Sequence, residues 1–550
     1  MRITLVSFLF FFITTICAQI NPGNIGASNL SAWFKATDLE IGADVETWPT
    51  SHTNTGSPIV LEDSNAPFSY ATDLGLYSNY NNAVSFAGNN GDQQRVLEKT
   101  ELLDLLDNST EGATGTFFAA YYLPESNSCT GCHVVNYREG GGSTADGIQF
   151  RVKIGTQNGR LAIGSGNSFD GSADFMQDFR PDIISYKGNK SGESTMNSYR
   201  RSLAFSEGGS SGTTGNTGLY LGARRFNGNY NAYFDGLIYE IIFYDRDLSE
   251  VEISKVHTYL AVKHGITLDN TGGENQGDYI STNGSVVWDA DFEVEYHNEI
   301  IGIAYDGAEG LLQLQSHTFM DTSRIYLDEI ANGNASNLGA FLNTGSYVMI
   351  GNNQGAMCGT ASSNLEIPVD SDIIERVERE WKVTNTNYAD EINLDFKVNS
   401  CIDLNSIDPL QLRFLVDDDG DFTNTEVYTI GASADLSIED GYVKIKDIVT
   451  QLIPINETRF VTIAISSSIS NNEEIGTDKF SIYPNPANDY FVVKTQVPNA
   501  KIGIYNALGQ IVLHKELKNA ADAETVIDIS EFPRGTYLIN LGNQYQTLIK

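Results

Sequence analysis

Short runs of aromatic and β-branched residues, separated by turns rich in glycine, asparagine and serine, recur along most of this chain. Two clear examples are residues 115–122 (GTFFAAYY) and 147–154 (GIQFRVKI). Such runs are typical of strands, and the 51 glycines of the chain supply many turns between them. Two antiparallel sheets can bury the apolar side chains of these strands while the polar ones face water. The sequence therefore predicts a mainly β, multidomain protein made of sandwiches.

The first 18 residues have the layout of a cleaved secretory signal. Arg2 precedes an apolar run over residues 5–13, and the small residue Ala18 follows at the expected cleavage position. Cys17 follows Ile16 where a lipoprotein signal requires a small residue, so we expect ordinary cleavage near Ala18 rather than lipidation. No later stretch reaches the roughly 18 consecutive apolar residues of a membrane-spanning helix. We expect an exported chain without a transmembrane segment in its mature part.

The charge balance is strongly acidic. The chain has 34 Lys and Arg residues against 71 Asp and Glu, which gives a formal net charge of −37. Binding to nucleic acid depends on basic side chains that displace counterions from phosphates, so nucleic acid is not an expected partner. The same carboxylates offer hard oxygen ligands suited to calcium, although most of them would simply face solvent.

About 530 residues remain after the signal, too many for one hydrophobic core. One helix stands out, because Ser249 and Glu252 form a capping box at its start and Gly265 supplies a stop. The stretch 269–277 lacks core-forming residues and indicates a connector, while the Ser/Asn/Glu-rich stretch 466–479 indicates a flexible linker. We predict the following parts: signal peptide 1–18, first sandwich 20–268, second β-rich domain 277–465, linker 466–479 and a small Ig-like sandwich 480–550.

The C-terminal part carries three motifs in order, FSIYPNPA at residues 480–487, IYNALGQ at 504–510 and GTYLI at 535–539, before a terminal LIK. With these motifs it resembles the type A sorting domain of the type IX secretion system. The local pattern agrees with a small sandwich, since its prolines favour an extended backbone and its glycines permit turns. The residues assigned to the sorting motif are Pro484, Asn485, Pro486, Gly509 and Gly535.

This resemblance implies recognition by the outer-membrane translocon of a Gram-negative bacterium. It also implies removal of the domain by a sortase-like peptidase in the linker, followed by release or attachment to surface lipopolysaccharide. The expected location is outside the cell, either secreted or on the outer surface. An ordinary terminal β-domain without a sorting role is the alternative.

Segments 30–36, 45–49, 83–88 and 234–244, the last of which runs into the expected helix, make residues 20–268 similar to laminin-G-like and concanavalin-like sandwiches. That fold serves sugar binding, protein adhesion and glycosidase chemistry, so it does not decide the function by itself. Residues 277–465 resemble an uncharacterised β-rich domain that commonly follows such sandwiches. The matching segments are 297–304, 314–316, 351–353 and 379–383.

The best candidate for a metal site is the acidic run LVDDDGDF at residues 415–422. Alternating Asp417, Asp419 and Asp421 could converge on one hard cation, with Asn424 or Glu426 completing the shell. The glycine does not stand where a standard calcium loop has it, and an acidic turn that binds no metal is the alternative. A structural Ca²⁺ is the one cofactor that the sequence suggests.

Four cysteines lie beyond the signal, and an even number in an exported chain is compatible with two disulfides. They are Cys129, Cys132, Cys358 and Cys401, and Cys358 with Cys401 is the pairing that we favour. Cys129 and Cys132, with His133, also spell the c-type haem motif. Because the flanking residues indicate a strand rather than the helix that such a site needs, no haem is expected.

Three aromatic residues are candidates for stacking on a sugar, because an exposed ring can bury the apolar face of a pyranose. They are Trp48, Tyr230 and Tyr233. A place in the core is the alternative, above all for Trp48, whose neighbours alternate as in a strand.

The sequence nominates no catalytic residues. Residues 208–212 match the nucleophile-elbow pattern by letter but lie in a Ser/Gly/Thr-rich tract without a preceding strand and following helix. The nearest carboxylate run, Glu293 and Glu295, lies outside the first sandwich. We therefore expect a non-enzymatic surface protein that binds extracellular glycan or glycoprotein in adhesion. A polysaccharide-degrading glycoside hydrolase and a purely structural spacer are the alternatives.

Overall fold

The computed structural model describes residues 20–550, apart from 41–43, 52–59, 64–67, 70–74, 87–95, 103–113, 125–131, 139–146, 154–159, 163–178, 190–196, 201–202, 208–216, 227–228, 274, 358–365, 370, 398–406, 429–434, 468–480, 495–500, 507–510, 518–523 and 542–543. The predicted signal peptide, most of the predicted linker, the 208–212 tract, Cys129, Cys358, Cys401 and Gly509 lie outside the described residues. The chain divides into two compact units, Met1–Ser467 and Ser468–Lys550. Antiparallel sheets build both units, which confirms the mainly β fold class.

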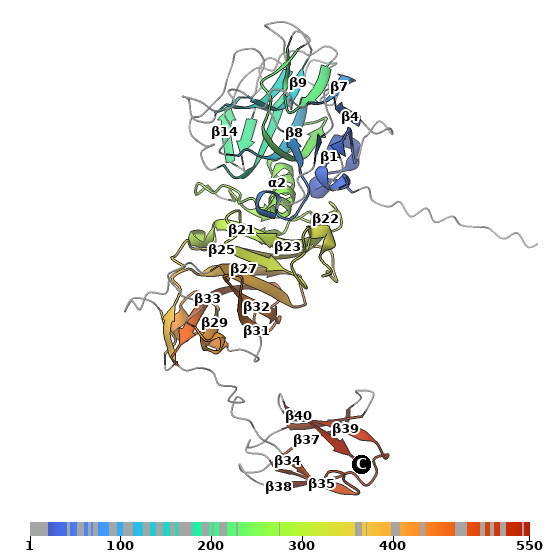
Figure 1. Cartoon of the computed structure of the whole chain (residues 1–550), viewed down its shortest axis with the longest axis vertical. Helices are drawn as coiled ribbons and strands as arrows, with labels where there is room; N and C mark the ends of the chain where they lie inside the picture. The colour runs from blue at the N-terminus through green and yellow to red at the C-terminus, as the bar shows by residue number, and fades with distance from the viewer. Residues whose placement is uncertain are drawn as a thin grey trace, which may run out of the picture. The chain divides into compact units, whose positions relative to one another are not determined.

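The first unit begins with a sandwich of two seven-stranded sheets (Figure 1). We call one of them the helix-side sheet: β1 (Leu30–Lys35), β18 (Gly236–Tyr244), β8 (Thr114–Tyr122), β12 (Pro181–Asn189), β13 (Asn197–Arg200) and β14 (Leu203–Glu207), with β6 (Val84–Phe86) paired to β18. The other is the outer sheet: β11 (Arg160–Ala162), β10 (Gly147–Lys153), β9 (Cys132–Arg138), β15 (Thr217–Leu221), β7 (Leu97–Leu102), β4 (Val60–Asp63) and β3 (Thr47–Pro49).

The core of this sandwich lies between the two sheets. Phe117 and Phe243 of the helix-side sheet are fully buried against Leu219 and Leu221 of the outer sheet. Because successive side chains of a strand point to opposite faces, the residue between the two leucines, Tyr220, lies on the other face of the outer sheet. That face is covered in part by a small hairpin, which consists of β16 (Arg224–Phe226) and β17 (Asn229–Asn231).

Helix α2 (Glu250–His264) confirms the helix expected from the sequence. The Ser249 side chain accepts a hydrogen bond from the backbone N–H of Glu252, whose own side chain accepts from the N–H of Ser249. Gly265 ends the helix at φ 63°, in the left-handed region that favours glycine. Both ends of this helix therefore form where the sequence places them.

One apolar core joins α2 to both halves of the first unit. On one side α2 packs against Phe118 and Tyr244 of the helix-side sheet. The same cluster continues to Trp288, Tyr347 and Met349 of the second half. Figure 1 shows α2 between the two sandwiches. Residues 20–268 and 277–465, which the sequence suggests as separate domains, thus lie in one compact unit with a shared helix.

The second half of this unit is also a sandwich. Its larger sheet contains β22 (Leu311–Gln313), β21 (Asn298–Asp306), β25 (Ser346–Asn352), β27 (Trp381–Thr386), β33 (Thr458–Ser466), β29 (Leu412–Asp417) and β30 (Glu426–Tyr428), with β26 (Ile373–Arg376) paired to β33. Its smaller sheet contains β23 (Gln315–His317), β24 (Ser323–Tyr326), β28 (Ile392–Lys397), β32 (Tyr442–Ile448) and β31 (Asp435–Glu439). Aliphatic and aromatic side chains fill the space between them, with Trp381 over Phe396 at 3.8 Å between ring centroids.

The second unit is a small sandwich of three and four strands. Its sheets are β34 (Ser481–Tyr483), β35 (Tyr490–Lys494) and β38 (Glu524–Asp528), and then β37 (Ile511–Glu516), β36 (Lys501–Tyr505), β39 (Thr536–Leu541) and β40 (Gln544–Ile549). Its core includes Phe491, Ile504, Ile527 and Ile539.

Short elements complete the described part of the chain. They are η1 (Pro22–Asn24), η2 (Ala27–Asn29), η3 (Ala36–Asp38), β2 (Asp44–Val45), β5 (Phe68–Ser69), α1 (Gly75–Ser78), β19 (Tyr279–Ile280), β20 (Val286–Trp288), η4 (Val294–Tyr296), η5 (Asn334–Ser336), η6 (Pro409–Gln411) and η7 (Phe422–Asn424). Among the described residues, no helix has the length and apolar character needed to cross a membrane.

Candidate functional site

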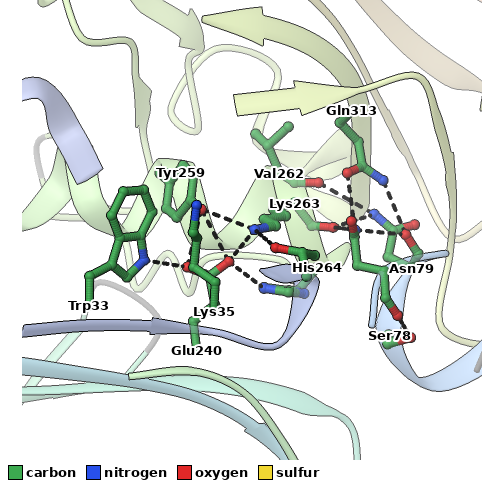
Figure 2. Close-up of polar contacts among 12 residues, drawn as sticks. Trp33, Lys35, Ser78, Asn79, Glu240, Tyr259, Val262, Lys263, His264 and Gln313 are labelled. Atoms are coloured by element: carbon green, nitrogen blue, oxygen red, sulfur yellow. Dashed lines mark hydrogen bonds and ion pairs between the residues drawn. The ribbon is translucent and has the colours of Figure 1, made fainter. Parts of the chain in front are cut away.

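Glu240 of β18 is a buried carboxylate of the first sandwich with several polar partners. Its side chain accepts hydrogen bonds from Trp33 Nε1 at 2.9 Å and from the Tyr259 hydroxyl at 3.1 Å to each carboxylate oxygen. Lys263 of α2 forms an ion pair with it (Figure 2). Burial alone would raise the pKa of Glu240, but Lys263 and the surrounding donors lower it to about 2. Glu240 is therefore ionised.

His264 lies next to this pair but is not hydrogen-bonded to it. Its Nε2 is 3.6 Å from Glu240 Oε1, and its ring stacks on Tyr239 with 4.7 Å between centroids. Burial lowers the pKa of His264, which favours the neutral imidazole. Glu, Lys, His and Tyr together have the composition of a catalytic site. However, Glu240, Tyr259, Lys263 and His264 are all at least nine-tenths buried, so the arrangement fixes α2 to β18 rather than meeting a substrate.

A second polar group ties the end of α2 to the other sandwich (Figure 2). Asn79 and Asn81 donate from Nδ2 to the carbonyl of Lys263 at 3.1 and 2.6 Å. Asn81 also donates to Gln313 Oε1 at 3.1 Å, and the Gln313 amide donates back to the carbonyl of Asn79 at 3.1 Å. Asn79 Oδ1 accepts from the backbone N–H of His317 at 2.9 Å. These bonds satisfy helix carbonyls that have no partner within α2.

The acidic run predicted as a calcium site is a turn whose carboxylates bind its own backbone. Asp417 Oδ2 accepts from the N–H groups of Asp419 and Gly420 at 2.9 and 2.7 Å. Asp419 Oδ1 accepts from the N–H of Asp421, whose Oδ1 accepts from Thr423. Within the described ranges, no cluster of three His, Cys, Asp or Glu side chains could hold a metal ion. The structure thus does not gather Asp417, Asp419 and Asp421 into one metal site.

Cys132 is disulfide-bonded and fully buried, and its partner is not among the described residues. Both Cys132 and His133 lie on β9, so this part of the haem-like motif is on a strand. The pairing of the cysteines, including that of Cys358 with Cys401, stays a prediction.

Trp48, one of the three candidates for sugar stacking, is a core residue. Its side chain is fully buried between the sheets, where Nε1 donates to the carbonyl of Lys35 at 3.1 Å. The ring meets Phe34 edge to face at 5.9 Å. A ring enclosed in this way presents no face to a sugar, so the stacking role suggested for Trp48 is wrong, and the alternative of a place in the core is correct.

Tyr230 and Tyr233, the other two candidates, are half-buried on the face of the outer sheet that points away from the sandwich core. They pack on a small apolar cluster of Val96, Tyr220 and Ala223. The Tyr230 hydroxyl donates to Glu98 Oε2, and its ring lies 6.3 Å from that of Tyr220. Burial raises the pKa of both Tyr230 and Tyr233, so both phenols stay neutral. Two tyrosine rings therefore line one surface of the first sandwich.

Strand register explains the polar residues that surround these rings. Tyr220 of β15 lies directly opposite Asn136 of β9 on one side and Glu98 of β7 on the other. Residues opposite each other in an antiparallel pair share a face of the sheet. Asn136, Tyr220 and Glu98 thus form one row across three strands, at the place where the β16–β17 hairpin lies.

Arg225 of the hairpin completes this group, which we call the Tyr–Arg site (Glu98, Asn136, Tyr220, Arg225, Tyr230 and Tyr233). Its Nη1 donates to the Tyr220 hydroxyl at 2.9 Å, and its backbone N–H donates to Asn136 Oδ1 at 3.3 Å. The guanidinium carbon lies 5.5 Å from the ring centre of Tyr220 and 5.9 Å from that of Tyr230. The hydrogen bond to Tyr220 raises the pKa of Arg225, which is therefore a permanent cation.

Two buried donor atoms of the Tyr–Arg site have no acceptor among the described residues. They are Asn136 Nδ2 and Arg225 Nε. A buried donor without a partner is costly, so a water or a ligand oxygen is a candidate acceptor for each of them. The site can therefore offer hydrogen bonds as well as aromatic surface.

Sequence reasoning found Tyr230 and Tyr233 but missed the other members of the site. Glu98, Asn136 and Tyr220 are far apart in the chain, and only strand pairing brings them into one row. The one local signal was Arg225, which stands five residues before Tyr230 across a short hairpin.

Two family models match parts of the chain. Residues 252–447 match a domain of unknown function (DUF8202), and residues 481–550 match the secretion system C-terminal sorting domain. The first match begins inside α2 and ends in β32, so the matched family includes the helix that both sandwiches share. The second match confirms the sorting domain at the end of the chain, and the protein is therefore secreted or attached to the outer cell surface.

The sorting motif is part of the packing of this domain. Asn485 Nδ2 donates to the carbonyl of Thr547 at 2.6 Å, and its Oδ1 accepts from the N–H of Ile549 at 2.9 Å. It stands between Pro484 and Pro486, which both follow cis peptide bonds. Gly535 lies directly before β39, where its N–H and carbonyl pair with Lys550.

Comparison with other proteins adds little on function. No curated protein matches the chain. Solved structures with some likeness include domain 4 of AbnA, a GH43 extracellular arabinanase from Geobacillus stearothermophilus, in complex with arabinotriose (13% identity, 42% of this chain, 98% of that chain, TM-score 0.27).

Two further solved structures also have low sequence identity and low TM-scores. They are the CBM40 of the Ruminococcus gnavus IT-sialidase bound to α2,3-sialyllactose (13% identity, 28% and 83% coverage, TM-score 0.22) and the binding domain of botulinum neurotoxin DC in complex with SialylT (9% identity, 96% and 93% coverage, TM-score 0.32). Likenesses this low carry no argument about this chain, and the laminin-G-like or concanavalin-like identity of the first sandwich stays a prediction.

Proposed function

We propose that this chain is a non-enzymatic binding protein of the cell exterior that recognises glycan or glycoprotein through the Tyr–Arg site. The observation that carries the proposal is the combination of two half-buried tyrosine rings with two buried donors that lack an acceptor among the described residues. Aromatic rings bury the apolar face of a sugar, and its hydroxyl oxygens accept from Asn and Arg donors. The sorting domain places this surface outside the cell, where such ligands occur.

Export through the type IX secretion system belongs to the same proposal. The translocon would recognise the sorting domain, and a sortase-like peptidase would cut in the linker at residues 466–479. The protein would then be released or attached to surface lipopolysaccharide, and could serve in adhesion.

A glycan array probed with the full secreted protein tests the binding function. We expect binding that falls about tenfold or more in the double variant Tyr230→Ala/Tyr233→Ala, because the loss of two stacking rings removes about 1–3 kcal/mol of contact. Tyr305→Ala is the matched control, since Tyr305 is a half-buried tyrosine of the other sandwich. Binding that is equal in all three proteins would contradict the role of the site.

A reducing-sugar release assay on the same protein separates binding from catalysis. Release of sugar from a bound polysaccharide would favour a glycoside hydrolase. If the protein neither binds nor releases sugar, a structural spacer becomes the better description.

A further inference from the structure

The Tyr–Arg site contains one cation, Arg225, and one anion, Glu98. Each of these charged groups is hydrogen-bonded to a tyrosine hydroxyl, and the two do not form an ion pair with each other. Arg225 donates to the Tyr220 hydroxyl, while Glu98 accepts from the Tyr230 hydroxyl. Both charges lie on one small area of the outer sheet, and Glu98 raises the pKa of Arg225. The site is thus electrically balanced, and its two charged groups keep hydrogen-bonding capacity for a ligand.

The unused hydrogen-bond donors lie on one side of the site and the unused acceptor lies on the other. On the arginine side, Arg225 Nε and Asn136 Nδ2 are donors without an acceptor in the described part of the chain. On the other side, the Tyr230 hydroxyl donates to Oε2 of Glu98, and no described residue donates to the second carboxylate oxygen, which can therefore accept. A matching ligand must therefore accept at one position and donate at another.

From this pattern, and on the basis of the proposed function, we infer that the ligand of the Tyr–Arg site is a neutral saccharide. One hydroxyl accepts, through water, from Arg225 Nε or Asn136 Nδ2, and another hydroxyl of the same sugar donates to Glu98. A hydroxyl group both donates and accepts, so a single uncharged ring can satisfy both sides. Tyr230 and Tyr233 contact its apolar face.

Charge disfavours the acidic alternative. A uronic or sialic acid could satisfy Arg225 through its carboxylate, but that carboxylate would approach Glu98, whose partner among the described residues is the neutral Tyr230 hydroxyl. The chain as a whole has a formal net charge of −37, so an anionic polysaccharide is repelled before it arrives. A neutral ligand meets neither penalty.

The wild-type protein can test this inference directly. On an array of matched pairs, each with a neutral hexose oligomer and the corresponding uronic acid oligomer, we expect the neutral member to bind at least about tenfold tighter. Because no ion pair forms with the ligand, we expect the dissociation constant to change less than about twofold between 50 and 500 mM NaCl. Tighter binding of the acidic member, with weakening in salt, would overturn the inference.

Two variants test the two sides of the site. Glu98→Gln turns an acceptor-only group into one that also donates, and Arg225→Met removes the donors while keeping the length of the side chain. Each is expected to weaken neutral glycan binding about tenfold, the loss of one hydrogen bond to a charged group. Glu391→Gln and Arg180→Met are the matched controls, because both residues are exposed elsewhere. Neutral glycan binding that is unchanged in Glu98→Gln would also contradict the inference, whereas stronger binding of the acidic oligomers by this variant is expected once the carboxylate is removed.

The outcomes distinguish this inference from the proposed function. If no glycan binds in a way that depends on Tyr230 and Tyr233, the proposed function fails. If glycans bind through these residues but the acidic members are preferred, only the neutral-ligand inference fails. Should either variant unfold, which its melting temperature reveals, the pair preference and the salt dependence of the wild-type protein still decide the question.

Discussion

At the residue scale, the buried ion pair of Glu240 and Lys263 is the clearest test of what holds α2 in place. Lys263→Met leaves an ionised carboxylate buried without its cation, and this is expected to lower the free energy of unfolding by about 3–5 kcal/mol. The double variant Glu240→Gln/Lys263→Met should recover much of that loss, because no charge then stays buried. Urea unfolding of the three proteins measures both effects, and a double variant no more stable than Lys263→Met would contradict this account.

The buried carboxyl group of Glu309 is expected to make the stability of the protein depend on pH. Burial first, and then the neighbouring Asp306, raise the pKa of Glu309 well above its ordinary value, so the folded protein keeps the proton. The unfolded chain releases it above about pH 4.3. In the window between that value and the folded pKa, the folded state binds more protons, and stability falls as pH rises.

Glu309→Gln should remove this pH dependence while its amide oxygen still accepts from the N–H of Gly23. Between pH 4.5 and pH 8, the free energy of unfolding of the variant should rise relative to that of the wild type. The expected rise is at most about 1.4 kcal/mol for each pH unit below the pKa of Glu309 in the folded protein. Urea unfolding at both pH values gives the difference. A difference that does not change with pH would show that Glu309 is ionised in the folded protein.

At the element scale, the end of α2 depends on the side chain of Asn79. Asn79→Ala removes its hydrogen bonds to the carbonyls of Val262 and Lys263 and to the N–H of His317, all of which are buried. The expected loss of stability is about 2–4 kcal/mol, since several buried groups lose their partners at once. Asn343→Ala, at an exposed asparagine, is the control and should change the melting temperature little.

The acidic turn after β29 yields a prediction about calcium. If the Asp417 carboxylate serves only Asp419 N–H and Gly420 N–H, Asp417→Ala should cost about 1–2 kcal/mol, equally with calcium and with chelator. Calorimetry on the wild-type protein should show no heat of calcium binding that Asp417→Ala abolishes. If the wild type were more stable than Asp417→Ala only in the presence of calcium, the metal site suggested by the sequence would be supported.

The sequence predicted well those features that depend on neighbouring residues in the chain. The capping box and the glycine stop set both ends of α2, and the run 115–122 became most of β8 (Thr114–Tyr122). The features that it missed depend on distant pairing. The row of Asn136, Tyr220 and Glu98 arises only from the order β9-β15-β7, which no local pattern contains. Alternation correctly suggested a strand around Trp48, but only the packed sheets decide which face is closed.

In the acidic turn, the spacing of the residues was likewise not enough to predict how their side chains are arranged. Spacing alone allowed Asp417, Asp419 and Asp421 to share one cation. Whether carboxylates converge or cap nearby N–H groups is decided by backbone dihedrals, such as the φ of 87° at Gly420, which the spacing does not contain.

At the scale of the whole molecule, the sorting domain decides where the protein acts. Deletion of residues 480–550 should leave the protein inside the cell, because the deletion removes the sorting domain on which export depends. Cell fractionation with immunoblotting measures this, and Glu98→Gln in the full chain is the control that should still be exported. Truncated protein found outside the cell would contradict the sorting role.

The helix that belongs to two cores has a mechanical consequence. A ligand held on the outer sheet, as proposed, would pull on a stack of packed layers, from that sheet through the helix-side sheet and α2 to β21 and β22. Tension from a bound surface would thus spread over interdigitated side chains and the Asn79 and Asn81 bonds together. If the proposed glycan binding serves in adhesion, such a stack would spread the load over many side chains at once.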